Sequence, residues 1–172
     1  TRLRDVGRTD PRGTRRRGFD PTAVASKVVA IARGLFGKQG EGASWVDLRL
    51  VPPDLPIEID GDEHAIEQAL LNLVLNAAGA CTANGRITVR ADSRSGGVRL
   101  TVEDDGPGVA PEVRDRLFEP FVTTKEVGKG TGLGLAVCRG LVEGAGGAIA
   151  LDSSHTPGAR FVVDLPAADV DS

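Results

Sequence analysis

Four glycines alternate with other residues between Gly128 and Gly134, and an amphipathic pattern follows them directly. Glycine has no Cβ, so this backbone can approach a ligand and adopt positive φ without steric cost. The next segment, LAVCRGLVEGAG, carries apolar residues at helical spacing, so the glycines lead into a helix N-terminus. The N–H groups there have no partner inside the helix, and the helix dipole is positive, which favours polyphosphate. We interpret this segment as a phosphate-binding lid, because a flexible linker is rarely followed at once by an amphipathic helix.

Charge and composition narrow the class of protein. The chain has 172 residues, 40% of them apolar and 26% charged, as in an ordinary soluble globular domain. Its net charge of −3 excludes the global basic field of nucleic-acid binders, so we expect no nucleic-acid partner. Cys81 and Cys138 have no metal-ligand spacing, which favours reduced thiols and a cytoplasmic location. No apolar run approaches the ~20 residues that span a bilayer.

The periodicity of apolar residues predicts an α+β fold. Helices are expected over 21–35, from the N-cap Asp62 to about Ala80, over 111–118, and from the glycine segment to about Glu143. Strands are expected over 45–51, 57–60, 87–91, 98–102, 148–152 and 159–165. The 62–80 helix has one broad apolar face, so it should lie against a sheet. We predict a two-layer α/β sandwich, with helices on one face of a mixed, mostly antiparallel sheet.

Two asparagines lie one turn apart in the predicted 62–80 helix. Asn72 and Asn76 interrupt the otherwise apolar stretch LLNLVLNAA, and their amides project from one face of the helix. An amide oxygen is a hard neutral ligand that suits Mg²⁺ already bound to phosphate oxygens. A pair of satisfied amides at the edge of the helix is the structural alternative.

A second polar motif, EDDGPGV, follows the strand that ends near Val102. It presents carboxylates at the strand end, and Gly106 and Gly108 allow a sharp turn around Pro107. A carboxylate can accept a hydrogen bond from the exocyclic amine of adenine, a donor that guanine lacks at that position. By itself the motif is equally consistent with an ordinary acidic turn.

Taken in order, these motifs resemble the N, G1, F and G2 boxes of the ATP-binding domain of sensor histidine kinases. NLVLNA matches the N box, DDGPG the first glycine box, LFEPF the phenylalanine box and GKGTGLGLA the second glycine box. The resemblance spans roughly 19–166, and the wording FEPFVTTK is most similar to kinases of the nitrogen-regulation type. It implies the Bergerat-type ATP-binding fold and Mg²⁺–ATP or ADP as ligand.

The resemblance also implies residue roles. Asn76 would hold Mg²⁺ against the phosphates, supported by Asn72, and Asp104 would bind the adenine amine. Gly106 and Gly108 would shape the pocket floor, and Phe118 and Phe121 would anchor the lid. Phosphate contacts would come from Lys125 or Lys129 and from the lid residues Gly128, Gly130, Thr131, Gly132, Leu133 and Gly134.

The type of reaction is indicated by Asn72. In the hydrolases of the wider superfamily, such as gyrase, a glutamate at this position acts as general base for water. An amide cannot do so at neutral pH, which argues for transfer of the γ-phosphoryl group rather than hydrolysis. Glu67 lies on another face of the helix and is not an obvious substitute. Many relatives also carry a basic residue where this chain has Gly79 and Ala80, which puts one phosphate contact in doubt.

The phosphoacceptor is missing from the sequence. His64 and His155 lack the flanking Glu/Asp and Pro of a phosphoacceptor box, and we expect both to be surface side chains. The Arg-rich 1–18 resembles the tail of a dimerisation helix, 19–166 would be the catalytic domain, and 167–172 a C-terminal tail. The absence of methionine suggests a fragment. Its partners would be its own dimerisation domain and, through the full-length kinase, a response regulator.

Three other functions remain open from the sequence. An anti-sigma-factor-type serine kinase would share the pocket and modify a separate protein. A non-catalytic domain could bind ATP to control association. An ATP hydrolase is opposed by Asn72. The domain is expected in the cytoplasm, either free or attached to a membrane-anchored parent protein.

Overall fold

The computed structural model describes residues 18–36, 46–81, 85–122, 134–155 and 157–168. Its strands are β1 (Gly18–Phe19), β2 (Asp47–Val51), β3 (Ile59–Asp60), β4 (Arg86–Arg94), β5 (Gly97–Asp104), β6 (Ala148–Leu151) and β7 (Arg160–Pro166). Its helices are α1 (Pro21–Phe36), α2 (Glu63–Ala80), α3 (Pro111–Arg114) and α4 (Gly134–Gly144). Among these residues, no helix combines the length and the apolar character needed to cross a membrane.

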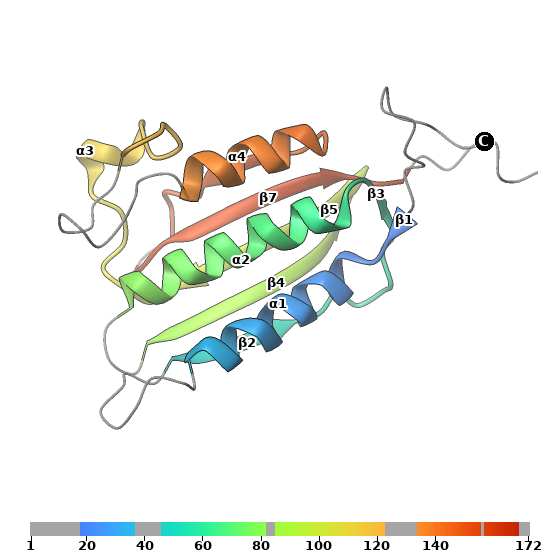
Figure 1. Ribbon diagram of the computed structural model, residues 1–172, viewed down its shortest axis with the longest axis horizontal. Coiled ribbons are helices and arrows are strands. Elements are labelled where there is room, and N and C mark those ends of the chain that lie inside the picture. The colour runs from blue at the N-terminus through green and yellow to red at the C-terminus, as the bar shows by residue number, and fades with distance from the viewer. Residues whose placement is uncertain (1–17, 37–45, 82–84, 123–133, 156, 169–172) are drawn as a thin grey trace, which may run out of the picture.

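The main sheet has five strands in the order β2-β4-β5-β7-β6. β2 pairs with β4 in parallel, and the other neighbours are antiparallel. Helices α1, α2 and α4 lie side by side across one face of this sheet (Figure 1). The predicted α+β sandwich is therefore confirmed. A second, two-stranded sheet of β1 and β3, which the sequence did not predict, lies at one end.

The core lies between the three helices and the sheet. α2 contributes the longest buried row, Ile66, Ala69, Leu70, Leu73, Val74 and Ala77. Alternate residues of the central strands face it, including Val89, Leu100 and Val163. The intervening strand residues are mostly polar and form the opposite, helix-free face of the sheet. The apolar strand residues therefore determine which face of the sheet the helices cover. The polar strand residues between them form the other face, which we call the open face.

Local signals place the two ends of α2 as expected. The Asp62 side chain accepts hydrogen bonds from the backbone N–H groups of His64 and Ala65, at 3.0 and 3.3 Å. It is therefore the N-cap that the sequence predicted. Cys81 is the C-cap, so α2 ends at Ala80. These caps fix the position of the two asparagines along the helix.

Two predicted boundaries were wrong. The helix expected over 111–118 ends at Arg114. Beyond it the chain continues in turns, with the N–H of Glu119 bonded to the carbonyl of Arg116, while Leu117 is buried in the core. The strands expected over 87–91 and 98–102 are longer, since β4 continues to Arg94 and β5 begins at Gly97, and they meet in a tight hairpin around Ser95 and Gly96. Gly96 has φ +79°, which a turn this short requires.

Candidate functional site

Asn72 and Asn76 both lie on α2, half-buried, at the edge of its apolar face. The Oδ1 atom of Asn72 accepts a hydrogen bond from Nε2 of Gln68 at 3.4 Å. Asn72 also lies beside the Cys138 thiol of α4, whose pKa burial raises to about 11. Within the described part of the chain, the side chain of Asn76 makes no hydrogen bond. Its amide oxygen, a hard ligand, therefore suits a magnesium ion that also contacts phosphate.

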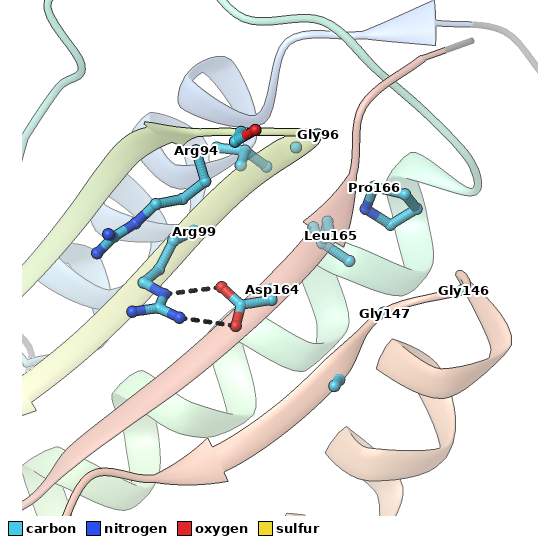
Figure 2. Close-up of a pocket in the computed structure, with 12 residues that line it drawn as sticks. Arg94, Gly96, Arg99, Gly146, Gly147, Asp164, Leu165 and Pro166 are labelled. Carbon is cyan, nitrogen blue, oxygen red and sulfur yellow. Dashed lines mark hydrogen bonds and ion pairs between the residues drawn. The ribbon is translucent and has the colours of Figure 1, made fainter.

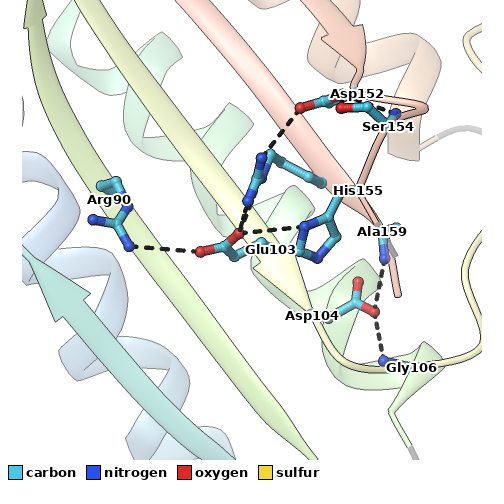
Figure 3. Close-up of polar contacts among 9 residues, drawn as sticks. Arg90, Glu103, Asp104, Gly106, Asp152, Ser154, His155 and Ala159 are labelled. Carbon is cyan, nitrogen blue, oxygen red and sulfur yellow. Dashed lines mark hydrogen bonds and ion pairs between the residues drawn. The ribbon is translucent and has the colours of Figure 1, made fainter. Parts of the chain in front are cut away.

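Asp104 is the last residue of β5 and is only 5% exposed. Its Oδ1 atom accepts hydrogen bonds from the N–H groups of Gly106 (2.9 Å) and Ala159 (3.3 Å; Figure 3). Burial raises the pKa of this carboxyl, and the two N–H donors act in the opposite direction. No hydrogen bond among the described residues engages Oδ2. One oxygen is therefore fixed by the backbone, and the other is left as an acceptor.

Glycines bring α2 and the segment after β5 into contact. A Cβ on Gly106 would lie 2.9 Å from the carbonyl oxygen of Ala80, the last residue of α2. Gly108 has φ +78°, and a Cβ there would lie 3.0 Å from the carbonyl oxygen of Gly158. Asn76 lies one helical turn before Ala80. The structure thus places Asn76, Asp104, Gly106 and Gly108 toward the C-terminal end of α2, with Asn72 one turn before Asn76 along the helix.

The two phenylalanines differ in their surroundings. The ring of Phe118 packs edge-on against Phe161 of β7, with centroids 6.1 Å apart and an interplanar angle of 82°. Phe118 therefore attaches the segment after α3 to the core. Phe121 is 76% exposed and has φ +67°. The lid that Phe121 would anchor lies outside the described residues, so the anchoring role of Phe121 stays a prediction.

Most of the predicted lid lies outside the described residues. This holds for Lys125, Gly128, Lys129, Gly130, Thr131, Gly132 and Leu133. Gly134 is the first residue of α4, so the segment does lead directly into a helix. Cys138 and Val142 of that helix are buried, as its amphipathic pattern predicted.

Sequence reasoning missed the connection between β6 and β7. The Pro157–Gly158 pair between the strands expected over 148–152 and 159–165 predicts only a turn. In the structure, Ala159 donates to Asp104, and Gly158 packs directly on the Asp104 backbone with φ +90°. A Pro-Gly pair signals a turn but not its partner across 54 residues. His155 is half-buried, with Nδ1 3.8 Å from Oε2 of Glu103, so the prediction of a surface histidine was wrong there. His64 is exposed, as predicted.

Comparisons with known proteins agree with this geometry. The family model described as histidine kinase-, DNA gyrase B- and HSP90-like ATPase matches residues 61–169. That span is more than half of the chain, and the chain belongs to this family. It includes α2 with its asparagines, Asp104 and the β6–β7 connection.

Individual relatives refine the class. The sensor histidine kinase ZraS of Escherichia coli K12 is 41% identical over 128 residues, which are 74% of this chain and 27% of ZraS. The catalytic domain of histidine kinase ThkA matches with a TM-score of 0.77 at 28% identity, over 90% of this chain and 97% of that domain. Full-length ShkA in complex with AMPPNP matches with a TM-score of 0.74 at 32% identity, over 91% of this chain and 32% of ShkA.

The share of each relative that this chain covers indicates which part of a sensor kinase it corresponds to. It spans about a quarter of ZraS but nearly all of the ThkA catalytic domain. It is therefore a nucleotide-binding ATPase domain of the histidine-kinase type, and its homologues are sensor histidine kinases.

Proposed function

We propose that this domain binds Mg²⁺–ATP at the α2 end of the sheet and transfers the γ-phosphoryl group to a histidine on a dimerisation domain. The observation that supports this most is the burial and the hydrogen bonding of the Asp104 carboxylate. Its carboxylate is buried, oriented through Oδ1 by two backbone N–H groups, and has Oδ2 left to accept from an adenine amine. The likeness to ShkA, which was solved with AMPPNP, supports an ATP-like ligand.

We assign each residue of the site to a different part of the ligand. Asp104 selects adenine, because its acceptor matches the exocyclic amine and opposes the carbonyl of guanine. Asn76 offers its amide oxygen to Mg²⁺, which when bound neutralises phosphate charge, and Asn72 supports that turn of α2. Lys125, Lys129 and the residues from Gly128 to Gly134 are proposed as the phosphate contacts. The γ P–O bond to ADP would break as a P–N bond to the histidine forms.

Transfer of the γ-phosphoryl group, rather than hydrolysis of ATP, is supported by the side chains around Asn72 and Asn76. Asn72 cannot deprotonate water. Glu67 is held by Lys27 of α1, with Nζ and Oε2 3.0 Å apart, and lies on another side of α2 from Asn76. Positioning and charge neutralisation can supply most of the catalysis of phosphoryl transfer without such a base.

The wider setting is part of the same proposal. The domain would act in the cytoplasm on its own dimerisation domain, and the full-length kinase would then pass the phosphoryl group to a response regulator. The similarity to ZraS, named as a sensor histidine kinase, supports this arrangement.

Calorimetry with ADP, in the presence of Mg²⁺ and of a chelator, tests the binding site. We expect Mg²⁺-dependent binding by the wild type, none by Asp104→Ala, and loss of the Mg²⁺ dependence in Asn76→Ala. If the wild type binds no adenine nucleotide, or if both variants bind like it, the assignment fails. Phosphohistidine formed after addition of the dimerisation domain would distinguish a kinase from a non-catalytic nucleotide sensor.

A further inference from the structure

The strand that carries Asp104 has a second polar site on its open face. Glu103 precedes Asp104, and alternation along β5 directs the two side chains to opposite faces of the sheet. Glu103 is the cross-strand partner of Arg160 on β7. Its Oε2 atom accepts hydrogen bonds from Nε and Nη2 of Arg160, at 2.9 and 2.7 Å (Figure 3). The Glu103 side chain is only 16% exposed and that of Arg160 is 34% exposed, so this pair is partly shielded from water.

The pair extends into the connection between β6 and β7. Nη1 of Arg160 donates to Oδ2 of Asp152 at 3.2 Å, and Oδ1 of Asp152 accepts from both N and Oγ of Ser154. The backbone N–H of Asp152 also donates to the carbonyl of Arg160 at 2.8 Å. Arg90 of β4 and His155 each lie 3.8 Å from Glu103. We call Glu103, Arg160 and Asp152 the open-face network.

The open-face network is linked to the carboxylate of Asp104 through the backbone of β7. Arg160 follows Ala159, which donates its N–H to Oδ1 of Asp104 and accepts the Asp104 N–H on its carbonyl at 2.9 Å. Gly158 packs on the Asp104 backbone so closely that a Cβ there would overlap the carbonyl group. A shift of β7 at Arg160 would therefore move a donor that orients the Asp104 carboxylate.

We propose that Glu103 and Arg160 are positioning residues for adenine recognition. From the open face of the sheet, their ion pair holds the β6–β7 connection in the register that aims Asp104 at the base. The proposal rests on the proposed function, because it assumes that Asp104 is the residue that selects adenine.

The same two strands supply a matched control at their other ends. Arg99 of β5 and Asp164 of β7 are also cross-strand partners and form two hydrogen bonds, at 2.7 and 3.0 Å (Figure 2). The two arginine side chains are about equally exposed, 35% for Arg99 and 34% for Arg160. Arg99 lines a pocket beside the Ser95–Gly96 turn, and that lining includes none of the described candidate site residues. Both pairs join the same strands, but only one is adjacent to Asp104.

The experiment compares Arg160→Gln with Arg99→Gln in the 172-residue chain. Calorimetry with Mg²⁺–ADP and Mg²⁺–GDP gives the preference for adenine, and thermal unfolding gives the stability. We expect Arg160→Gln to raise the Kd for ADP about tenfold and to lower the ADP-over-GDP preference. Arg99→Gln should leave both within about twofold. It should also lose less stability than Arg160→Gln, because its partner Asp164 is 49% exposed whereas Glu103 is 16% exposed. Arg160→Lys should recover part of the affinity, because it restores the charge but not the two-point contact.

The possible results distinguish failure of the proposed nucleotide-binding function from failure of the positioning role of Glu103 and Arg160. If the wild type binds no ADP, the proposed function fails. If it binds ADP and the two glutamine variants change the Kd and the base preference equally, the positioning role is overturned and the nucleotide site stands. Should Arg160→Gln fail to fold, Glu103→Gln replaces it, since it keeps the shape of the side chain and removes the charge. A Glu103→Gln variant with unchanged base preference would equally overturn the proposal.

Discussion

At the scale of single residues, Asp104 holds a charge on the side of β5 that is otherwise buried and apolar. Burial raises the pKa of its carboxyl above the ordinary value of 3.8. The folded chain therefore holds this proton more tightly than the unfolded chain does. The resulting stabilisation is complete below the ordinary pKa and is lost as the pH rises through the raised folded value. At neutral pH the buried charge thus opposes folding, and it is retained where a ligand can use it.

Asp104→Asn separates binding from stability. The asparagine Oδ1 can still accept from Gly106 and Ala159, but the buried charge is gone. We expect a higher Tm than wild type at pH 7, a difference that shrinks as the pH falls toward 3.8, and loss of ADP binding. Asp104→Ala, which also loses the acceptor, should have a lower Tm than Asp104→Asn. A Tm for Asp104→Asn below that of wild type at pH 7 would contradict the reasoning.

Gly158→Ala tests the contact behind Asp104. The added Cβ would overlap the Asp104 carbonyl group, and the backbone has φ +90°. We expect a loss of about 2 kcal/mol or more in the free energy of unfolding, measured by denaturant titration, and weaker ADP binding. Gly96→Ala is the control, because Gly96 has φ +79° but open space around it. If both variants are equally destabilised, the backbone angle and not the contact explains the effect.

At the scale of elements, the sequence predicted what local patterns encode. Its periodicity placed α2 and the central strands, and Asp62 marked a helix start that the structure confirms. The sequence-based prediction failed where contacts between residues distant in the sequence determine the local structure. Leu117 and Phe118 read as a continuing helix, but burial of Leu117 and the contact of Phe118 with Phe161 hold the chain in turns instead. The role of Ala159 was equally hidden, because its partner Asp104 is remote in sequence.

Helix α4 offers a prediction of its own. Gly140 lies in its interior, is exposed, and would place a Cβ in open space. Gly140→Ala should raise the free energy of unfolding by about 0.5–1 kcal/mol, because alanine loses less backbone freedom on folding. Denaturant titration measures this. Gly147→Ala is the contrast, since a Cβ there would overlap the carbonyl oxygen of Asp164, and it should destabilise the domain.

At the scale of the whole molecule, the open face of the sheet responds to acid. Arg99 lowers the pKa of Asp164 through their hydrogen bonds, and Ser154 lowers that of Asp152. A carboxyl with a lowered folded pKa stabilises the fold above its ordinary pKa of 3.8, and this contribution is lost as the pH falls through the folded value. Partial exposure of both carboxyls keeps each effect small.

Arg99→Gln checks this dependence. The variant should unfold at a lower temperature than wild type at pH 7, because the Asp164 carboxylate loses its partner. The difference should narrow when the pH is lowered below 3.8, where protonation weakens the pair in the wild type as well. A Tm difference that stays constant with pH would show that Arg99 stabilises the sheet by packing alone.

The described chain begins and ends beside the same short strand. Gly18 pairs with Asp60, and the N–H of Ala168 donates to the carbonyl of Glu58. Ala167 is bonded to Gly96, so both ends lie near the β4–β5 turn, whereas Asp104 is at the opposite end of β5. Eight strand residues separate the two by roughly 25 Å. A fluorophore or immobilisation tag placed at either end would therefore leave access for nucleotide open, which makes both ends suitable for building a reporter of ligand occupancy.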